Sequence, residues 1–391
     1  MIIKPKVRGF ICTTAHPVGC AENVRLMTEY AASHPGKGPK RVLVIGSSTG
    51  YGLATRIAAA FSYGADTIGV FLEKPGSGGG RTATAGWYNN AAFEKLARER
   101  DLIAESVCGD AFSGQVKEET IRLVRKNLGK LDLVVYSVAS PRRTDPLTGE
   151  IYNSVIRPIG SVFTGKTVNM NTGELSEVTI KPAASDEIKD TISVMGGEDW
   201  LLWMRALIEA DILSDGVKTV AYSYIGPVVT HPIYKDGAIG KAKEDLEEKA
   251  RQINQMLSKK GGEAFLSVNK ALVTQSSSAI PVVPLYISIL FKVMKRRDVH
   301  EGCIEQMARM MDRLYGGGRV MPADEPGRLR LDDWEMDPAV QREVATIWEQ
   351  INQGNLEELC DLAGYRHEFY RLFGFEAPGV DYSADLPEDI I

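Results

Sequence analysis

The sequence predicts an α/β fold in which helices cover both faces of a doubly wound parallel sheet. Residues 40–140 alternate between short β-branched runs and segments with helical spacing, which is typical of successive βαβ units. The links between these segments are short, and a glycine-rich turn follows the first apolar run. A chain of 391 residues with 44% hydrophobic and 25% charged residues is also long and apolar enough for a large core.

The predicted elements of residues 40–140 follow one another at regular intervals. Strands are expected over 41–45, 67–71, 103–107 and 131–138, and helices over 49–62, 88–98 and 112–128. Within the first helix, Leu53, Ile57, Ala60 and Phe61 share one face. Because strands that alternate with helices pair in parallel, this sheet should be buried on both faces.

The pattern changes between residues 141 and 184. Turn sequences at 145–150 and 169–174 separate short alternating runs, which predicts a β-hairpin insertion. The α/β pattern then resumes, with helices expected over 198–210 and 240–257 and strands over 218–224 and 264–273. Beyond residue 283 the chain should be mostly helical, ending in helices over 339–351 and 356–372.

Composition excludes several classes of protein. The formal net charge of −5 disfavours a nucleic-acid binder, which would need a basic face for phosphates. No run approaches the roughly 20 apolar residues that cross a bilayer, and the N-terminus lacks the apolar core of a signal peptide. The five cysteines are scattered without CxxC spacing, so neither disulfides nor a metal site are expected, and the cytoplasm is the expected compartment.

The glycine-rich turn, GSSTGYG at residues 46–52, lies between a strand and a helix. This context makes the turn a predicted Rossmann-type dinucleotide site rather than an ordinary βα turn. Gly46 would allow the tight turn, Gly50 would let the backbone approach a phosphate, and Gly52 would let helix and sheet pack closely. The following helix N-terminus offers free N–H groups and a partial positive charge to a pyrophosphate.

Glu73 indicates which dinucleotide is bound. It follows the second strand, about 20 residues beyond Gly52, where a carboxylate accepts hydrogen bonds from the adenosine ribose. A carboxylate there repels a 2′-phosphate and therefore favours NADH over NADPH, although Lys74 beside it weakens that preference. Asp110-Ala111 and Ser137–Ala139 follow the third and fourth strands, at the same carboxyl edge of the sheet.

A tyrosine and a lysine are the candidate catalytic pair. None of the 14 tyrosines has a lysine four residues on, which disfavours an ordinary short-chain dehydrogenase. Tyr234 instead precedes Lys241 and Lys243, and it follows the strand expected over 218–224. Tyr286 and Lys295 repeat the nine-residue spacing, but Tyr286 lies in an apolar segment typical of a core or an acyl-pocket wall.

Helix geometry constrains this pair. Nine residues on one α-helix would place Tyr234 and Lys243 about 13 Å apart along the axis and on opposite faces. The two can therefore cooperate only if Tyr234 lies before the helix, with Gly237 and Gly240 shaping its entry. Lys241 shares the face of Tyr234 at about 10 Å along the axis, so spacing alone leaves both lysines open.

Longer motifs extend over the whole chain. They are MIIKP (1–5), AHPVGC (15–20), GWYNN (86–90), ASPRR (139–143), MGGEDW (195–200), FKVMK (291–295) and HEGCIEQ (300–306). In these motifs the chain resembles the trans-2-enoyl-CoA reductase family, which includes the FabV-type enoyl-acyl-carrier-protein reductases. The resemblance implies that the chain reduces the C2–C3 double bond of trans-2-enoyl-CoA, or of enoyl-acyl-carrier protein, with NADH in fatty acid metabolism.

The resemblance also implies roles for individual residues. The family's Tyr-x8-Lys pattern fits Tyr234 and Lys243 as catalytic residues, and Tyr224 resembles the substrate-contacting tyrosine. By the same resemblance NADH should contact Gly46, Ser47, Ser48, Thr49, Gly50, Tyr51, Leu72, Glu73, Asp110, Ala111, Val138, Ala139, Lys243, Leu272, Val273 and Thr274. The family's C-terminal part has been associated with flavin, but no flavin motif is found and none is expected here.

One large α/β domain is expected over residues 1–391. Its parts would be an N-terminal addition and link (1–39), a dinucleotide-binding half (40–140), the hairpin insertion (141–184), a catalytic half (185–282) and a helical substrate-side and C-terminal segment (283–391). We expect a monomer. The apolar run over 276–294 is open to two interpretations, an acyl-chain wall or a buried helix.

Two alternative functions remain at this point. One is a different NADH enzyme on the same fold, such as a 3-ketoacyl or alcohol dehydrogenase, which the missing Tyr-x3-Lys disfavours. The other is a non-catalytic module that senses NADH. His16, His231 and His300 show no spacing that suggests a metal site or a catalytic triad.

Overall fold

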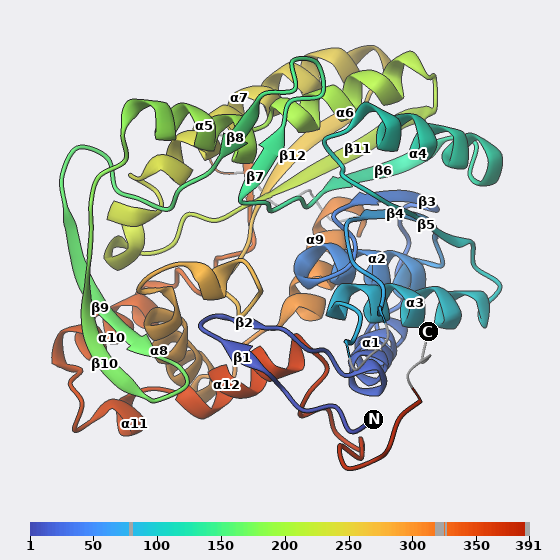
Figure 1. Ribbon diagram of the computed structural model, residues 1–391. Coiled ribbons are helices and arrows are strands. Elements are labelled where there is room, and N and C mark those ends of the chain that lie inside the picture. Colours follow the sequence, from blue (N-terminus) through green and yellow to red (C-terminus); the bar gives the residue numbers. More distant parts are fainter. Residues whose placement is uncertain (78–80, 317–323, 325–326, 388–391) are drawn as a thin grey trace.

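A seven-stranded parallel sheet forms the centre of the molecule (Figure 1). The computed structural model describes residues 1–77, 81–316, 324 and 327–387. The strands are β3 (Arg41–Ile45), β4 (Asp66–Phe71), β5 (Ala104–Cys108), β6 (Leu131–Tyr136), β11 (Leu213–Ser223), β12 (Glu263–Val268) and β13 (Arg328–Arg330). Their order in the sheet is β13-β12-β11-β6-β3-β4-β5, and every neighbouring pair is parallel. The predicted doubly wound α/β fold is confirmed.

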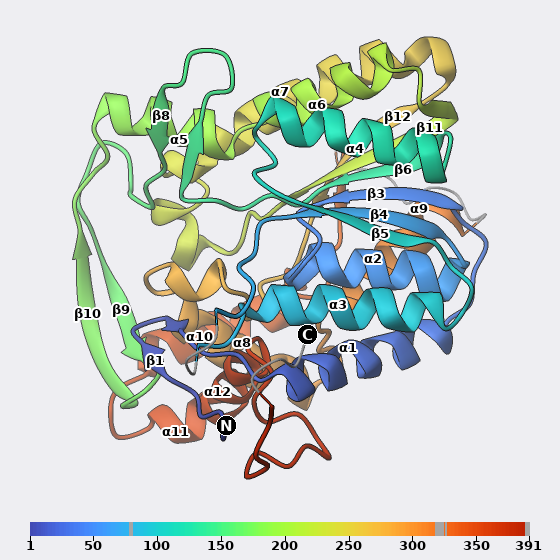
Figure 2. The same ribbon diagram turned by 45° about the vertical axis from the view of Figure 1, so that its right-hand side comes forward.

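Helices cover both faces of this sheet, as Figure 2 shows. One face carries α1 (Pro17–Ala32), α2 (Gly50–Tyr63), α3 (Ala85–Arg98) and α9 (Cys303–Tyr315), and the other carries α4 (Gly114–Asn127), α6 (Glu198–Glu209) and α7 (Ala238–Leu257). Val42 and Val44 of β3 belong to the first core and Leu43 and Ile45 to the second. This alternation explains why a strand with no polar side of its own forms here: both of its faces are buried.

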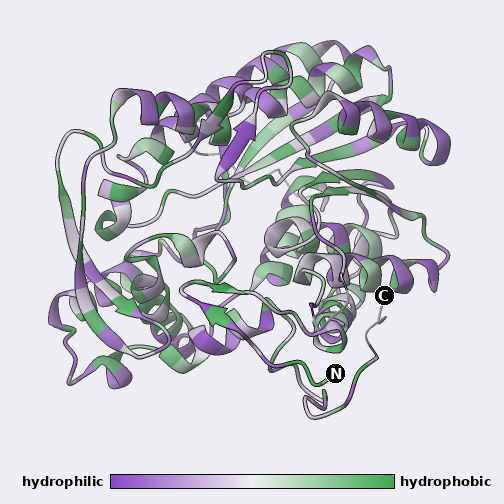
Figure 3. Ribbon diagram, in the orientation of Figure 1, coloured by the Kyte–Doolittle hydropathy of each residue, from purple (hydrophilic) through white to green (hydrophobic). Residues whose placement is uncertain are grey.

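A third core lies beside the sheet and is helical. It is built by α8 (Val283–Arg296), α10 (Pro338–Gln350), α11 (Leu356–Leu359) and α12 (Leu362–Arg371). Within α8, the residues from Val283 to Met294 are buried except Lys292, so that helix forms the centre of this core. In Figure 3 the helices that cover the sheet alternate between hydrophilic and hydrophobic residues, as expected when one face of each is buried.

The predicted insertion consists of two hairpins. A short one pairs β7 (Arg142–Thr144) with β8 (Ile151–Asn153), and a longer one pairs β9 (Phe163–Asn169) with β10 (Glu174–Ile180). The longer hairpin reaches the helical core, where the Lys166 ammonium donates hydrogen bonds to the carbonyl oxygens of Trp348, Glu349 and Ile351 at the end of α10. A lysine at this position satisfies carbonyl groups that a helix end leaves without partners.

Several boundaries differ from the sequence expectation. The strand expected over 264–273 ends at Val268, because from Lys270 on the backbone N–H groups bond elsewhere: that of Lys270 to the Gln306 side chain and that of Ala271 to Glu335. The strand expected over 131–138 ends at Tyr136, and the one expected over 218–224 begins earlier, at Leu213. Helix α5 (Ser185–Met195) and strand β13 were not expected.

The N-terminal segment forms a short hairpin, β1 (Val7–Arg8) with β2 (Ile11–Cys12), followed by α1. Helix α1 packs on α2 and α3, so this segment covers one face of the dinucleotide-binding half. Among the described residues, no helix is both long and apolar enough to cross a membrane.

Candidate active site

The candidate site lies at the carboxyl ends of the strands, where the strand order reverses. Strand β3 has β4 on one side and β6 on the other, so the connections that leave β3 and β6 diverge to opposite faces of the sheet. Such a point leaves a crevice in which α/β sheets bind ligands. The glycine turn follows β3, and Ser137–Ala139 follow β6 at the same edge.

The glycine turn depends on close approaches that only glycine permits. Gly46 has a φ of +88°, and a Cβ on it would lie 2.2 Å from the carbonyl oxygen of Ser137. A Cβ on Gly52 would lie 1.8 Å from the carbonyl oxygen of Gly46. The first glycine therefore permits the turn against β6, and the last lets α2 begin directly over it.

The segment after β12 adjoins this turn. The Tyr51 hydroxyl donates a hydrogen bond to the carbonyl oxygen of Lys270 at 2.6 Å. A Cβ on Gly50 would lie 3.8 Å from Cγ2 of Thr274. Thr274, expected from the resemblance to contact the cofactor, thus lies next to the glycine turn, while Leu272 and Val273 before it are buried.

Glu73 lies against the glycine turn as well. The Ser48 hydroxyl donates a hydrogen bond to Oε1 of Glu73 at 2.7 Å. A Cβ on Gly86 would lie 2.0 Å from the same oxygen, so the start of α3 makes room for the carboxylate. Leu72, by contrast, is 69% exposed and faces solvent.

Side chains of α4 and α6 hold the Asp110-Ala111 turn that follows β5. The carbonyl oxygen of Ala111 accepts hydrogen bonds from the Lys117 ammonium at 2.8 Å and from the Trp203 indole N–H at 3.1 Å. Lys117 is paired in turn with the buried Asp199 at 2.7 Å. The turn is therefore held at the carboxyl edge, and Val138 and Ala139 lie at the same edge after β6.

Tyr234 lies before α7 and not on it. It ends a 3₁₀ turn over Val228–Ile233, and α7 begins at Ala238 with Gly237 as its N-cap. A Cβ on Gly240 would lie 1.8 Å from the carbonyl oxygen of Lys235, so the chain turns sharply into the helix. This is the entry that the pair Tyr234 and Lys243 requires.

The two candidate lysines point to different environments. Lys241 is exposed and pairs with Glu244 on the same helix. The Lys243 ammonium instead donates a hydrogen bond to the carbonyl oxygen of Tyr222 at 3.3 Å, at the carboxyl end of β11. Burial lowers the pKa of Lys243 to about 8. The ring of Tyr222 meets that of Tyr51 edge to face at 5.9 Å, so Lys243 and the glycine turn approach the same residue.

Tyr224 and Tyr234 are in contact. Their ring centroids lie 4.9 Å apart with an interplanar angle of 83°. The Tyr224 hydroxyl donates a hydrogen bond to Oε1 of Glu335 at 3.1 Å. Burial raises the pKa of Tyr234 well above its ordinary value, and no hydrogen bond within the described part of the chain contributes to that shift. Tyr234 therefore keeps its phenolic proton at neutral pH.

The alternative pair, Tyr286 and Lys295, lies on one helix with its two side chains in different surroundings. Tyr286 is fully buried in α8, and its hydroxyl donates a hydrogen bond to Glu335 at 2.6 Å. Lys295, nine residues later on the same helix, pairs with Asp361 at the surface. Because the two side chains leave the helix in different directions, they cannot form a catalytic pair.

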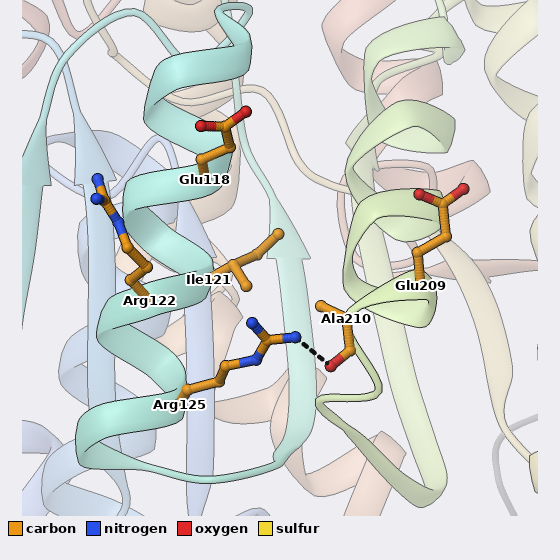
Figure 4. A pocket seen from close by; sticks show the side chains of 6 residues that line it. All are labelled: Glu118, Ile121, Arg122, Arg125, Glu209 and Ala210. Carbon is orange, nitrogen blue, oxygen red and sulfur yellow. Dashed lines mark hydrogen bonds between the residues drawn. The ribbon is translucent and has the colours of Figure 1, made fainter.

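A surface hollow of about 410 Å³ lies away from this edge (Figure 4). Its lining residues come from α4 and the end of α6: Glu118, Ile121, Arg122, Arg125, Glu209 and Ala210. The Arg125 guanidinium donates a hydrogen bond across it to the carbonyl oxygen of Ala210. None of the predicted site residues lies in it, so the hollow is not the candidate active site.

Sequence reasoning missed two residues that shape the site. Gly86 belongs to the motif GWYNN, but nothing in that motif indicates that its missing Cβ makes room for Glu73. Glu335 gave no signal at all, because it lies in a segment without periodicity and reaches Tyr224 from 111 residues away in the chain. Only the fold brings it to the site.

Three protein families match consecutive parts of the chain. Residues 2–78 match the family described as the NAD(P)H binding domain of trans-2-enoyl-CoA reductase. Residues 81–315 match the trans-2-enoyl-CoA reductase catalytic region. Residues 323–386 match the enoyl reductase FAD binding domain.

Curated relatives and solved structures are similar over nearly the whole chain. A trans-2-enoyl-CoA reductase [NADH] of Ruminiclostridium cellulolyticum is 58% identical over 100% of this chain and 98% of its own. An enoyl-[acyl-carrier-protein] reductase [NADH] of Coxiella burnetii is 57% identical over 98% of this chain and 95% of its own. The crystal structure of Treponema denticola trans-2-enoyl-CoA reductase in complex with NAD has a TM-score of 0.95 and 48% identity, covering 99% of this chain and 98% of that one.

The residues of the third matched segment do not fit a flavin. Where the segment approaches the site, its acidic side chains are engaged by protein groups: Asp332 with Arg330, Asp333 with Arg309 and Arg313, and Glu335 with the two tyrosines and Ala271. In its described part, α10 and α12 pack on α8 to complete the helical core. No glycine turn between a strand and a helix occurs in that part, so it lacks the phosphate-binding feature of a dinucleotide site.

Proposed function

The chain belongs to the trans-2-enoyl-CoA reductase family, and on that premise we propose that Tyr234, Lys243 and the glycine turn together form its catalytic site. The reaction is the NADH-dependent reduction of the C2–C3 double bond of trans-2-enoyl thioesters, so the protein is an oxidoreductase. The site assignment rests on one observation: Tyr51 and Lys243 both contact Tyr222. The Tyr51 ring contacts the Tyr222 ring, and the Lys243 ammonium bonds to the Tyr222 carbonyl oxygen. Both contacts are made at the carboxyl end of β11, which supports a common site for the glycine turn and Lys243.

The cofactor would lie along the carboxyl edge. We propose that its pyrophosphate meets the N-terminus of α2 at Gly46–Tyr51 and that its adenosine ribose bonds to Glu73. The Asp110-Ala111 turn and Val138-Ala139 would contact the adenine side, and Leu272–Thr274 the nicotinamide side. Support comes from the hydrogen bond between Ser48 and Glu73 and from the closeness of Gly50 to Thr274.

Tyr234 would act on the thioester oxygen. NADH, when bound, supplies the hydride that adds to C3 of the enoyl thioester. Negative charge then develops on the thioester oxygen, and a protonated phenol can donate a hydrogen bond or a proton to it. The raised pKa of Tyr234 keeps the phenol protonated and suits it to this role.

Lys243 would hold the nicotinamide ribose and support Tyr234. The residue is half-buried and its ammonium bonds to a backbone carbonyl oxygen at the strand end, where it would also meet a ribose hydroxyl of bound NADH. Lys241 would have no such role, because Glu244 holds it on the outside of α7.

The acyl chain would extend beside α8. Tyr224 and Tyr234 both pack against the apolar core that contains this helix, so a chain that leaves the thioester meets apolar side chains. Tyr224 would then position the thioester. We propose enoyl-CoA as the substrate and enoyl-acyl-carrier protein as a second carrier of the same acyl group.

The charges at the end of α8 do not favour a docking site for an acidic carrier protein. Lys295 pairs with Asp361, and Arg296 and Arg297 pair with Glu343. These pairs neutralise much of the charge run, so it offers an acidic partner little attraction. We propose further that the enzyme acts as a monomer in the cytoplasm, which agrees with five cysteines that are all free thiols.

NADH oxidation with different thioesters tests this function. The purified protein should oxidise NADH in the presence of crotonyl-CoA, longer enoyl-CoAs or enoyl-acyl-carrier protein, and should not do so with acetoacetyl-CoA. Turnover of acetoacetyl-CoA in place of crotonyl-CoA would assign a ketoreductase instead. Tight NADH binding without turnover of any enoyl thioester would indicate a sensor.

A further inference from the structure

Glu335 is a fully buried carboxylate that is hydrogen-bonded to Tyr224, the proposed substrate-binding tyrosine. It lies between β13 and α10, in a turn that the strand-and-helix pattern of the sequence does not single out. The side chain has no exposed surface. An isolated carboxylate in such a place is strongly unfavourable unless several donors satisfy it.

Three donors from three different segments meet this carboxylate. Oε1 accepts from the hydroxyl of Tyr224 at 3.1 Å and from that of Tyr286 at 2.6 Å. Oε2 accepts from the backbone N–H of Ala271 at 2.7 Å. Glu335 thus joins the end of β11, helix α8 and the segment that follows β12.

Two of these segments are parts of the proposed site. Tyr224 touches Tyr234 edge to face, and Ala271 immediately precedes Leu272–Thr274, the proposed nicotinamide contacts. Tyr286 belongs to neither, because it is enclosed in the helical core. Its shorter bond to Oε1 anchors the carboxylate and leaves the weaker bond to Tyr224 as the one that reaches the site.

The chemistry of a carboxylate fixes the direction of the Tyr224 proton. In the hydrogen bond to Oε1 of Glu335 the Tyr224 hydroxyl is the donor, so its single O–H points to Glu335 and away from the substrate. Tyr224 can then meet the thioester only through its ring and the lone pairs of its oxygen. Tyr234, whose hydroxyl is not held in this way, remains the donor for the thioester oxygen.

We propose that Glu335 is a positioning residue for the reductase reaction. Its hydrogen bond to Tyr224 fixes the ring and the hydroxyl proton of that tyrosine. Its hydrogen bond to Ala271, just before the proposed nicotinamide contacts, holds Tyr224 and that segment in a fixed relative position. The inference rests on the proposed function of Tyr224 and Tyr234 and extends it to a residue of the C-terminal segment.

A double-mutant cycle between Glu335 and Tyr224 tests the proposal. Glu335→Gln keeps the shape of the side chain but brings an NH₂ group that can donate to Tyr224 or oppose the Ala271 N–H. We expect kcat/KM with crotonyl-CoA to fall about tenfold in Glu335→Gln, the usual scale for a lost hydrogen bond to a charged group. In a Tyr224→Phe background the same substitution should cost less than about twofold, because the partner is already gone.

Asp332→Asn is the matched control. Asp332 is equally buried and lies three residues before Glu335, but it pairs with Arg330 and does not touch Tyr224. A purely structural effect would lower the melting temperature in both variants and would be as large with Tyr224 present as without it.

The outcomes separate the inference from the function on which it rests. An undiminished effect of Glu335→Gln in the Tyr224→Phe background would overturn the positioning role while leaving the reductase function standing. Normal activity in Tyr224→Phe would remove Tyr224 from the mechanism and the inference with it, whereas absence of enoyl thioester turnover in the unmodified protein would overturn the function itself. If Glu335→Gln does not fold, Glu335→Asp, which keeps the charge but shortens the reach, enters the same cycle with the same expected coupling.

Discussion

The rings of Tyr224 and Tyr234 meet edge to face, with their centroids 4.9 Å apart. Tyr224 ends the strand β11, whereas Tyr234 follows a 3₁₀ turn ten residues later. The contact therefore brings the chain back onto the strand end and fixes the Tyr234 ring there. Edge-to-face pairs of this kind are worth about 0.5–1.5 kcal/mol beyond their burial. The proposed catalytic phenol is held through its ring, and this arrangement would leave its hydroxyl for the substrate.

Tyr234→Phe should lower kcat with crotonyl-CoA at least about a hundredfold, the scale of losing one donor to a developing oxyanion. NADH affinity, measured by the change in NADH fluorescence, should remain unchanged, because the phenol is not a proposed cofactor contact. Tyr152→Phe is the control, since the Tyr152 hydroxyl bonds to Glu150 on an exposed hairpin away from the candidate site. Near-normal turnover would remove Tyr234 from the mechanism.

Lys243→Met should be far more damaging than Lys241→Met. The Lys243 ammonium lies at the end of β11, while that of Lys241 is paired with Glu244 at the surface. We expect Lys243→Met to raise the KM for NADH and to lower kcat, and Lys241→Met to leave both within about twofold. The reverse order in steady-state kinetics would mean that Lys241 is the partner of Tyr234.

The activity should decline as the pH rises through the pKa of Lys243. Burial lowers this pKa to about 8, so the ammonium is present below that pH and lost above it. A profile of kcat/KM for NADH should therefore fall above about pH 8, and Lys243→Met should lack this limb. Because the pKa of Lys243 is about 8 in the folded protein and 10.5 in the unfolded chain, its ionisation increases the free energy of unfolding as the pH rises from 8 to 10.5. The decline in activity therefore cannot come from unfolding caused by the deprotonation of Lys243. If the unmodified protein and Lys243→Met show the same decline above pH 8, the decline belongs to another titrating group.

Glu73→Ala should relax the preference for NADH. The carboxylate lies against Ser48 in the glycine turn, where it would repel the 2′-phosphate of NADPH. Its removal should reduce the ratio of kcat/KM for NADH to that for NADPH about tenfold. Ser48→Ala keeps the charge and is the control, expected to preserve that ratio. An unchanged ratio in Glu73→Ala would contradict the assigned role.

Gly52→Ala should destabilise the protein and weaken NADH binding together. A Cβ at this position would lie 1.8 Å from the carbonyl oxygen of Gly46, so the turn or α2 must shift. We expect a loss of about 1–3 kcal/mol in the free energy of unfolding, measured by urea denaturation. Gly114→Ala, with no atom within 4 Å of the added carbon, should be close to neutral. A neutral Gly52→Ala would show that the turn is not tightly packed.

Much of the fold could be predicted from local patterns. The strand at Arg41–Ile45 is as expected, and the helix after it lies within one residue of expectation, because glycine and apolar periodicity mark both. The end of β12 could not be predicted, since the apolar run continues to Val273 while its backbone donors bond to Gln306 and Glu335. Such bonds depend on residues far along the chain, and no local pattern contains them.

The sequence by itself determined the parallel sheet, the glycine turn at its edge and the candidate tyrosines, because each depends on a spacing of a few residues. It left two lysines open beside Tyr234 and gave no sign of Glu335. Only the tertiary structure distinguishes the environments of the two lysines: Lys241 pairs with Glu244 at the surface and Lys243 reaches the strand end. Glu335 meets Tyr224 only because β13 and α10 pack beside β12 and α8. Long-range packing, rather than local propensity, sets which polar groups share a buried site.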